Sequence, residues 1–147
     1  TDEVITRLMQ AAMAAPSAIN EQAWQFIVVR QRELLDKIPQ VHPYTPLPKA
    51  PLAIIVCGDL RSQVEKGWWV QDCSAATQNI LLAAHAMGLG AVWCGVYPVE
   101  GRVRGLQEMF GLPEHIIPMA LIVIGHPDER KRPSNRFDPA KVHYDRW

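Results

Sequence analysis

The stretch Ala15-Pro16-Ser17-Ala18-Ile19-Asn20-Glu21-Gln22-Ala23-Trp24 separates a helix-like segment from the strand-like run Gln25-Phe26-Ile27-Val28-Val29. Upstream of it, apolar residues recur at helical spacing, so we expect a helix that ends near Ala15, ahead of Pro16. A turn rich in proline, serine and asparagine exposes backbone N–H groups, a hydroxyl and an amide at the edge of a buried layer. Such a turn can hold a planar polar ligand, and we interpret it as a candidate cofactor site.

Continuous apolar runs further along the chain predict a buried sheet. Leu52 to Asp59 is an apolar run closed by a turn, which is typical of a strand covered on both faces. Helices must therefore flank the sheet. Further strands are expected over Gln25–Arg30, Ala91–Cys94 and Met119–Gly125.

The longest helix is expected from about Gly67 or Val70 to Met87, where small apolar side chains form a wide surface. Shorter helices are expected over 32–38 and 99–110, and the five prolines from Pro39 to Pro51 predict an irregular surface connection. The pair Gly88 and Gly90 follows a helix and opens a strand, the reverse of the order in a dinucleotide-binding glycine loop. We therefore exclude a Rossmann fingerprint.

The composition favours a single soluble domain over residues 1–147. With 147 residues and 48% hydrophobic content, the chain can bury one substantial core and is too short for two ordinary domains. Its 15 basic residues balance 15 acidic residues, so no global field exists to attract nucleic acid or an anionic membrane. Because no apolar stretch could cross a bilayer and the N-terminus does not resemble a signal peptide, we expect a cytoplasmic protein.

Residues that often carry metal or hydrolytic chemistry are not arranged for it. Cys57, Cys73 and Cys94 are widely spaced in apolar surroundings, so we expect buried free thiols rather than disulfides or a zinc site. The five histidines do not pair at metal-ligand spacing, and we predict no metal. No nucleophile elbow or thiol-protease motif is present, so hydrolase chemistry has little support.

The opening turn resembles the Pro-Ser-x-x-Asn-x-Gln-Pro-Trp signature of the FMN-dependent nitroreductase family, with Ala23 where that family usually has proline. The resemblance continues in order through Gly88-Leu89-Gly90-Ala91-Val92-Trp93-Cys94-Gly95, Gly111-Leu112-Pro113 and Gly125-His126-Pro127-Asp128-Glu129 to the ending Arg136-Phe137-Asp138 and His143-Tyr144-Asp145-Arg146-Trp147. It covers nearly the whole chain. Each piece alone is weak, but the ordered set is specific for the family, although not for a substrate.

The resemblance implies three groups of cofactor-binding residues. The turn residues reach FMN bound mainly to the other subunit: Pro16, Ser17, Ala18, Asn20 and Gln22. The strand end lies beside the flavin ring, where Gly95 would let a backbone N–H face the N5 nitrogen: Trp93, Cys94, Gly95 and Val96. Basic residues of the tail hold the phosphate: Arg132 and Arg136, with Ser134 between them.

Without the resemblance, simpler interpretations of these segments would be preferred. The turn would be a helix-to-strand connection in which Ser17 and Asn20 satisfy local backbone groups. The basic cluster, which also contains Arg130 and Lys131, would be a solvated tail. Asp72 and Asn79 lie roughly on one face of the long helix and are interpreted as capping or buried hydrogen-bonding residues.

The chain departs from the family pattern at its start. The family normally begins with a basic segment of the type Arg-Arg-Ser-x-Arg that grips FMN, and this segment is absent here. Either an upstream segment is missing or flavin is bound with fewer donors. We expect the former, because losing several charge-assisted bonds of about 1.5–3 kcal/mol each would weaken binding severely.

The implied fold is α+β, with a mixed, mainly antiparallel sheet flanked by helices in an α/β sandwich. The family resemblance further implies a homodimer with the long helix in the interface and FMN between the subunits. The aromatic tail is expected to lie along a surface such as a neighbouring subunit's.

The implied activity is that of an FMN-dependent NAD(P)H oxidoreductase. Electrons pass from NADH or NADPH through FMN to a nitroaromatic, a quinone or a related small-molecule acceptor, with ping-pong kinetics and no essential catalytic side chain. One alternative is a non-catalytic flavin-binding sensor or storage module of the same fold. Another is a specialised relative such as a dehalogenase or a flavin-consuming enzyme, with the Pro39–Pro51 loop as its lid. Residues around His42 to Tyr44 are expected, from position alone, to shape the substrate entrance.

Overall fold

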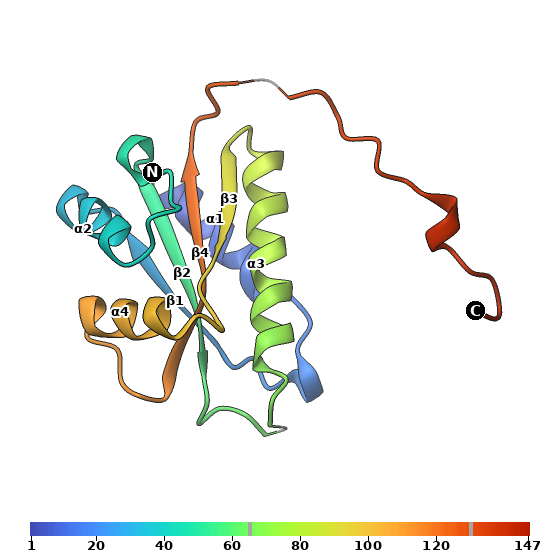
Figure 1. Cartoon of the computed structure of the whole chain (residues 1–147), viewed down its shortest axis with the longest axis horizontal. Helices are drawn as coiled ribbons and strands as arrows, with labels where there is room; N and C mark the ends of the chain where they lie inside the picture. Colours follow the sequence, from blue (N-terminus) through green and yellow to red (C-terminus); the bar gives the residue numbers. More distant parts are fainter. Residues whose placement is uncertain (65, 130) are drawn as a thin grey trace.

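The structure is a computed structural model that describes residues 1–64, 66–129 and 131–147. Helices and strands alternate along the chain (Figure 1). The helices are α1 (Asp2–Met13), α2 (Arg32–Lys37), α3 (Trp69–Ala86) and α4 (Glu100–Phe110). The strands are β1 (Trp24–Val29), β2 (Leu52–Asp59), β3 (Gly90–Gly95) and β4 (Ile116–Gly125). Short 3₁₀ turns cover Ala18–Asn20, Ile38–Gln40, Leu47–Lys49 and Pro139–Lys141.

The four strands form one sheet in the order β1-β2-β4-β3, and every neighbouring pair is antiparallel. The α+β class expected from the sequence is confirmed, but within the described residues the sheet is antiparallel throughout rather than mixed. The physical reason lies in the last strand. The β2-α3-β3 unit makes β2 and β3 run parallel to each other, but β4 inserts between them and opposes both.

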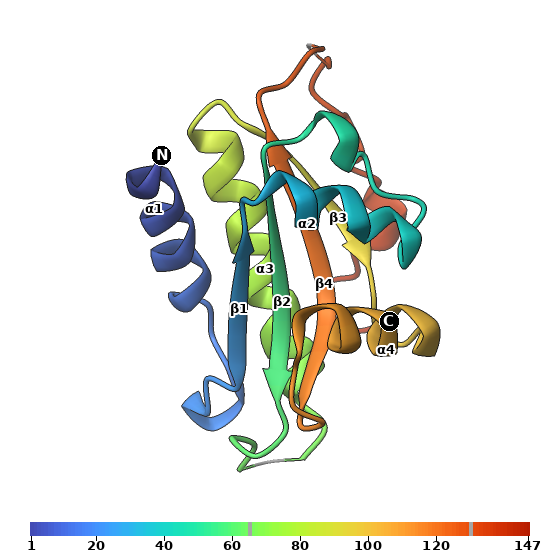
Figure 2. The ribbon, with the colours of Figure 1, turned by 90° about the vertical axis from the view of Figure 1, so that its left-hand side faces the viewer.

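Helices cover both faces of the sheet, as the continuous apolar character of β2 predicts. Side chains alternate along a strand, so Ile54 and Val56 pack toward α1 and α3, whereas Ile55 and Cys57 pack toward α2 and α4. Figure 2 shows α2 and α4 in front of the sheet and α3 behind it. All of β2 is buried.

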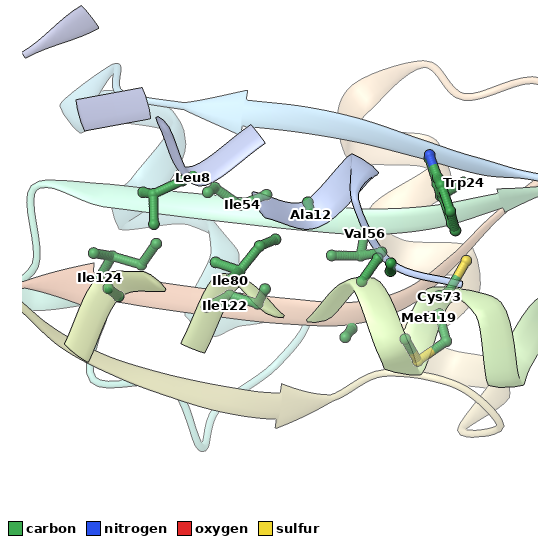
Figure 3. Close-up of a cluster of buried hydrophobic side chains, with 14 of the residues drawn as sticks. Leu8, Ala12, Trp24, Ile54, Val56, Cys73, Ile80, Met119, Ile122 and Ile124 are labelled. Carbon is green, nitrogen blue, oxygen red and sulfur yellow. The ribbon is translucent and has the colours of Figure 1, made fainter. Parts of the chain in front are cut away.

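The core on the α1 and α3 side packs aliphatic side chains of both helices against the sheet (Figure 3). Leu8 of α1 and Ile80 of α3 are fully buried against Ile54 and Ile122 of the sheet. Burial of one such side chain contributes roughly 1.5–3 kcal/mol, and the core on the α2 and α4 side buries large aliphatic side chains in the same way.

A β-bulge in β4 lies beside the end of β3, next to the candidate functional site. The β2–β4 register shifts between Val56 and Cys57, where Met119 is the extra residue of a β-bulge. The carbonyl of Met119 accepts both Val96 N–H (3.3 Å) and Tyr97 N–H (3.0 Å). β4 also begins at Ile116, earlier than predicted, because Pro118 sits beside the bulge where a ladder hydrogen bond is dispensable.

Candidate functional site

The turn after α1 is a strained but internally bonded loop. Ile19, Asn20 and Gln22 all have positive φ, at 43°, 59° and 52°. Non-glycine residues rarely adopt this region, and it persists only where surrounding contacts impose it. Ser17 Oγ accepts a hydrogen bond from Gln22 N–H (3.0 Å), and Gln22 Nε2 donates to Asn20 Oδ1 (2.9 Å). The exposed amides of this turn are thereby held in defined directions.

The turn is tied to the first turn of α3 by an acidic pair. Ala18 N–H donates to Asp72 Oδ1 at 2.9 Å, and Asp72 is only 4% exposed. Burial raises the pKa of the Asp72 carboxyl, the Ala18 N–H opposes that rise, and the neighbouring Glu21 carboxyl adds to it. Glu21 Oε2 in turn accepts Val64 N–H (2.8 Å). The prediction that Asp72 forms a buried hydrogen bond is confirmed.

The second predicted segment is the end of the edge strand β3. Cys94 and Val96 are buried, whereas the Trp93 side chain is 37% exposed. Hydrogen bonds alternate along an antiparallel strand, and Val96 N–H bonds to β4, so the N–H and C=O of Gly95 point to the open edge. A Cβ built on Gly95 would meet no atom within 4 Å among the described residues. A ligand can therefore approach the backbone here.

The start of α3 brings these two segments to one end of the molecule. Trp69, in the first turn of α3, makes an edge contact with Tyr97, just after β3, with ring centroids 4.9 Å apart. Asp72, in the same first turn of α3, holds the Ala18 turn. A Cβ on Gly58 would lie 2.4 Å from Trp69 Cε3, so glycine at the end of β2 makes room for this indole.

The three cysteines are buried free thiols, as predicted. Burial raises the pKa of Cys57 and Cys73 to about 12, and burial also raises that of Cys94. Thiolates are therefore disfavoured, and Cys94 acts here as a small packing residue of the α2 and α4 core.

The tail residues predicted to hold a phosphate lie apart from the turn and from β3 within one chain. Arg132, Ser134 and Arg136 are exposed, and Figure 1 shows the described tail running away from the sheet. Lys131, expected to be a surface residue, is exposed and pairs with Glu129 at 2.9 Å. Arg130 lies outside the described residues.

Two side chains contact the Gly95 carbonyl: Arg102, which the sequence analysis missed, and His42, which it placed near the substrate entrance from position alone. Arg102 of α4 donates from Nη1 to the Gly95 carbonyl at 2.8 Å, and His42 Nε2 lies at the same distance from the same oxygen. Nothing local in the sequence marks Arg102, which is one of several charged residues on α4.

Two hollows lie at the opposite end of the sheet from Gly95. One of about 310 Å³ is bordered by Val4, Leu52 and Ile124, and the other lies along Gly88–Val92 and the start of the tail. None of the twelve predicted cofactor-binding residues borders either hollow. In the described part of the chain, no helix has the length and apolarity needed to cross a membrane.

Comparison with known proteins agrees with this architecture. The model of the nitroreductase family matches residues 1–126, which include the turn and the end of β3. A Methanothermobacter thermautotrophicus protein, provisionally named an NADH dehydrogenase/NAD(P)H nitroreductase, is 54% identical over 99% of this chain and 77% of its own length. The chain belongs to the nitroreductase family.

Solved structures extend the agreement to the fold. A protein of Clostridium acetobutylicum, provisionally named an NADH oxidase, superposes with a TM-score of 0.96 at 42% identity over 100% of this chain and 90% of that one. A Desulfovibrio desulfuricans structure, provisionally described as a nitroreductase in complex with FMN, superposes at 0.85 with 29% identity over 100% of this chain and 86% of that one.

Proposed function

We propose that this protein is a flavin-dependent oxidoreductase that transfers electrons from NADH or NADPH through FMN to a nitroaromatic, a quinone or a related small acceptor. The observation that carries the proposal is the gathering of two segments around the first turn of α3, the Ser17–Gln22 turn and the end of β3. Both segments lie within the part matched by the family model. The FMN-bound relative from Desulfovibrio desulfuricans supports the choice of cofactor.

The residues present fit this cofactor. FMN offers ring carbonyl and nitrogen acceptors, for which the turn supplies a hydroxyl and two amides. The open space at Gly95 suits close approach of a flat ring to the backbone. The guanidinium groups of Arg132 and Arg136 match a phosphate.

FMN, when bound, supplies the redox chemistry by accepting a hydride and passing electrons on. The residues of this chain bind and orient FMN and its substrates, and none is assigned as an essential acid or base. Within the described residues the one sheet is antiparallel and holds no parallel nicotinamide-binding unit, so we expect the two substrates to take turns over one ring. We therefore expect ping-pong kinetics.

A homodimer with α3 in the interface completes the proposed site. Large apolar side chains are exposed on or beside α3 and β3, and burial of some of them in an interface would favour association. They are Leu82, Val92, Trp93 and Tyr97, together with Trp68 at the start of α3. In a dimer, the tail of one subunit can bring Arg132 and Arg136 to a site on its partner. Light scattering after size exclusion should give twice the mass of the chain.

The first experiment is an absorbance spectrum of the purified protein, followed by anaerobic addition of NADH and then NADPH. Flavin bands that bleach with a nicotinamide and return with a quinone or a nitroaromatic support the proposed oxidoreductase. Bands that remain unbleached favour a flavin-binding sensor or storage module. A protein that is colourless and takes up no added FMN contradicts both. Steady-state data with varied donor and acceptor should give parallel double-reciprocal lines.

The phosphate assignment is tested separately by FMN titration. Arg132→Ala and Arg136→Ala should each weaken FMN binding about tenfold or more, because each removes a charge-assisted hydrogen bond. Lys131→Ala is the matched control, since that ammonium group pairs with Glu129. Equal affinities in all three variants would rule out the assignment.

A further inference from the structure

The carbonyl of Gly95 is held by two side chains from the face of the sheet that α2 and α4 cover. His42 Nε2 and Arg102 Nη1 each lie 2.8 Å from this oxygen. A carbonyl oxygen can only accept, so His42 Nε2 carries the proton and donates. Two donors on one peptide oxygen fix the plane of the Gly95–Val96 peptide.

The position of His42 is built into the fold. The residue is 2% exposed and lies in the proline-rich connection, where its own backbone N–H donates to the Ile38 carbonyl at 2.9 Å. Thr45 Oγ1 donates to the His42 carbonyl at 3.0 Å. Val41 packs so closely on α4 that a Cβ at Gly105 would lie 2.3 Å from Val41 Cγ1. The glycine in α4 thus allows the connection to bring His42 to Gly95.

Arg102 reaches the same oxygen from α4. Its guanidinium carbon lies 5.6 Å from the centre of the Tyr44 ring, within the range of a cation–π contact. Tyr44 also makes an edge contact with His42, with ring centroids 6.4 Å apart. The three side chains form one cluster, here called the Gly95 clamp: His42, Tyr44 and Arg102.

The backbone at Gly95 needs such a restraint more than other positions of β3 do. Glycine has the widest backbone freedom of any residue, and Gly95 lies on the edge strand β3, where no other described strand pairs with its outward groups. Its C=O and N–H point to the same side of an antiparallel strand. The carbonyl belongs to the Gly95–Val96 peptide and the N–H to the preceding peptide, with only φ and ψ of Gly95 between them. Holding the carbonyl therefore narrows the backbone conformations open to Gly95, the residue at which the proposed function places the close approach of the flavin ring.

We propose that His42 and Arg102 are positioning residues that clamp the Gly95 carbonyl and so hold the backbone at Gly95 in the conformation that receives the flavin ring. This inference rests on the proposed function for the identity of the ligand. The clamp itself is a property of the flavin-free chain. The clamp has two consequences. The amides that follow Gly95 exchange slowly, and the flavin affinity and midpoint potential depend on His42 and Arg102.

The test uses His42→Leu, His42→Gln and Arg102→Ala in the full chain. Leucine retains volume but has no donor, whereas the glutamine amide can donate where the imidazole Nε2 does. Arg104→Ala is the matched control, because Arg104 is on the same helix and pairs with exposed Glu100. The measurements are the FMN dissociation constant, the flavin midpoint potential, the melting temperature and amide exchange at Val96 and Tyr97.

His42→Leu and Arg102→Ala should weaken FMN binding tenfold or more, shift the potential and speed exchange at Val96 and Tyr97 at least tenfold. His42→Gln should restore most of the affinity, and Arg104→Ala should match the wild type. If His42→Leu does not fold, Arg102→Ala decides the question, because its side chain is not part of the core. Folded variants with wild-type affinity, potential and exchange overturn the clamp. A wild type that binds no FMN contradicts the proposed function, while exchange in the flavin-free protein still decides the clamp.

Discussion

Asp72 Oδ1 accepts the backbone N–H of Ala18 at 2.9 Å, joining the first turn of α3 to a loop 54 residues earlier in the sequence. The loop next to this bond contains three non-glycine residues in left-handed conformations. The bond therefore stabilises a geometry that the local sequence disfavours. It also sets the position of Ser17 and Asn20 relative to the end of β3.

Replacing Asp72 by alanine should destabilise the protein by about 1–3 kcal/mol, because the Ala18 N–H loses its acceptor in a partly buried place. Asp72→Asn retains an oxygen acceptor and should cost less. Asp36→Ala is the control, since Asp36 is exposed and makes an i,i+4 pair with Arg32 worth only about 0.3–0.5 kcal/mol. Urea unfolding measures all three. A loss for Asp72→Ala no larger than for Asp36→Ala would show that the bond does not anchor the loop.

Asp72 should also make stability depend on pH. Burial raises the pKa of its carboxyl in the folded protein above the unfolded value of about 4. Between these two values the folded state binds more protons than the unfolded state, so the free energy of unfolding falls as pH rises through the folded pKa. The contribution is complete below pH 4. Urea unfolding of wild type and Asp72→Asn from pH 4 to 8 should give a flatter dependence for the variant, and identical slopes would contradict the prediction.

Two glycines of α4 should respond oppositely to alanine. Gly105→Ala places a Cβ 2.3 Å from Val41 Cγ1 and should destabilise the protein by roughly 1–3 kcal/mol. At Gly101 a Cβ meets no described atom within 4 Å, so the gain in helix propensity should stabilise the protein by up to about 1 kcal/mol. Thermal unfolding of the two variants measures the difference. A stabilised Gly105→Ala would mean that Val41 can move aside at little cost.

The thiols should be unreactive in the native protein. Cys57 and Cys73 are fully buried with pKa values raised to about 12, and burial also raises the pKa of Cys94. A disulfide reagent at pH 8 should therefore label no cysteine before unfolding and all three in urea. Rapid native labelling of a single thiol, located by peptide mapping, would identify a site that opens locally.

Much of the local structure follows from short-range sequence patterns. The apolar run of β2 indicates a strand buried on both faces, and the predicted bounds Leu52–Asp59 are those observed. Gly111 ends α4 in a left-handed conformation, with φ of 62°, where the sequence predicts the end of that helix. Such features depend on side-chain periodicity and on glycine's freedom at a cap, which neighbouring residues determine.

The order of the strands does not follow from the same patterns. A strand, a long helix and another strand indicate a parallel pair, and only the placement of β4 between β2 and β3 makes the sheet antiparallel throughout its described residues. Residues far along the chain decide this arrangement. Periodicity shows which face of a strand is apolar, but not which strand lies beside it.

The same division applies to the candidate site. The sequence by itself determined the apolar layers, the polar turn at Ser17 and the glycine at the end of β3, because each is a property of neighbouring residues. Only the tertiary structure decided that Asp72 holds Ala18 and that His42 and Arg102 meet at the Gly95 carbonyl. Those contacts join positions 54, 53 and 7 residues apart, and they depend on how whole helices dock on the sheet.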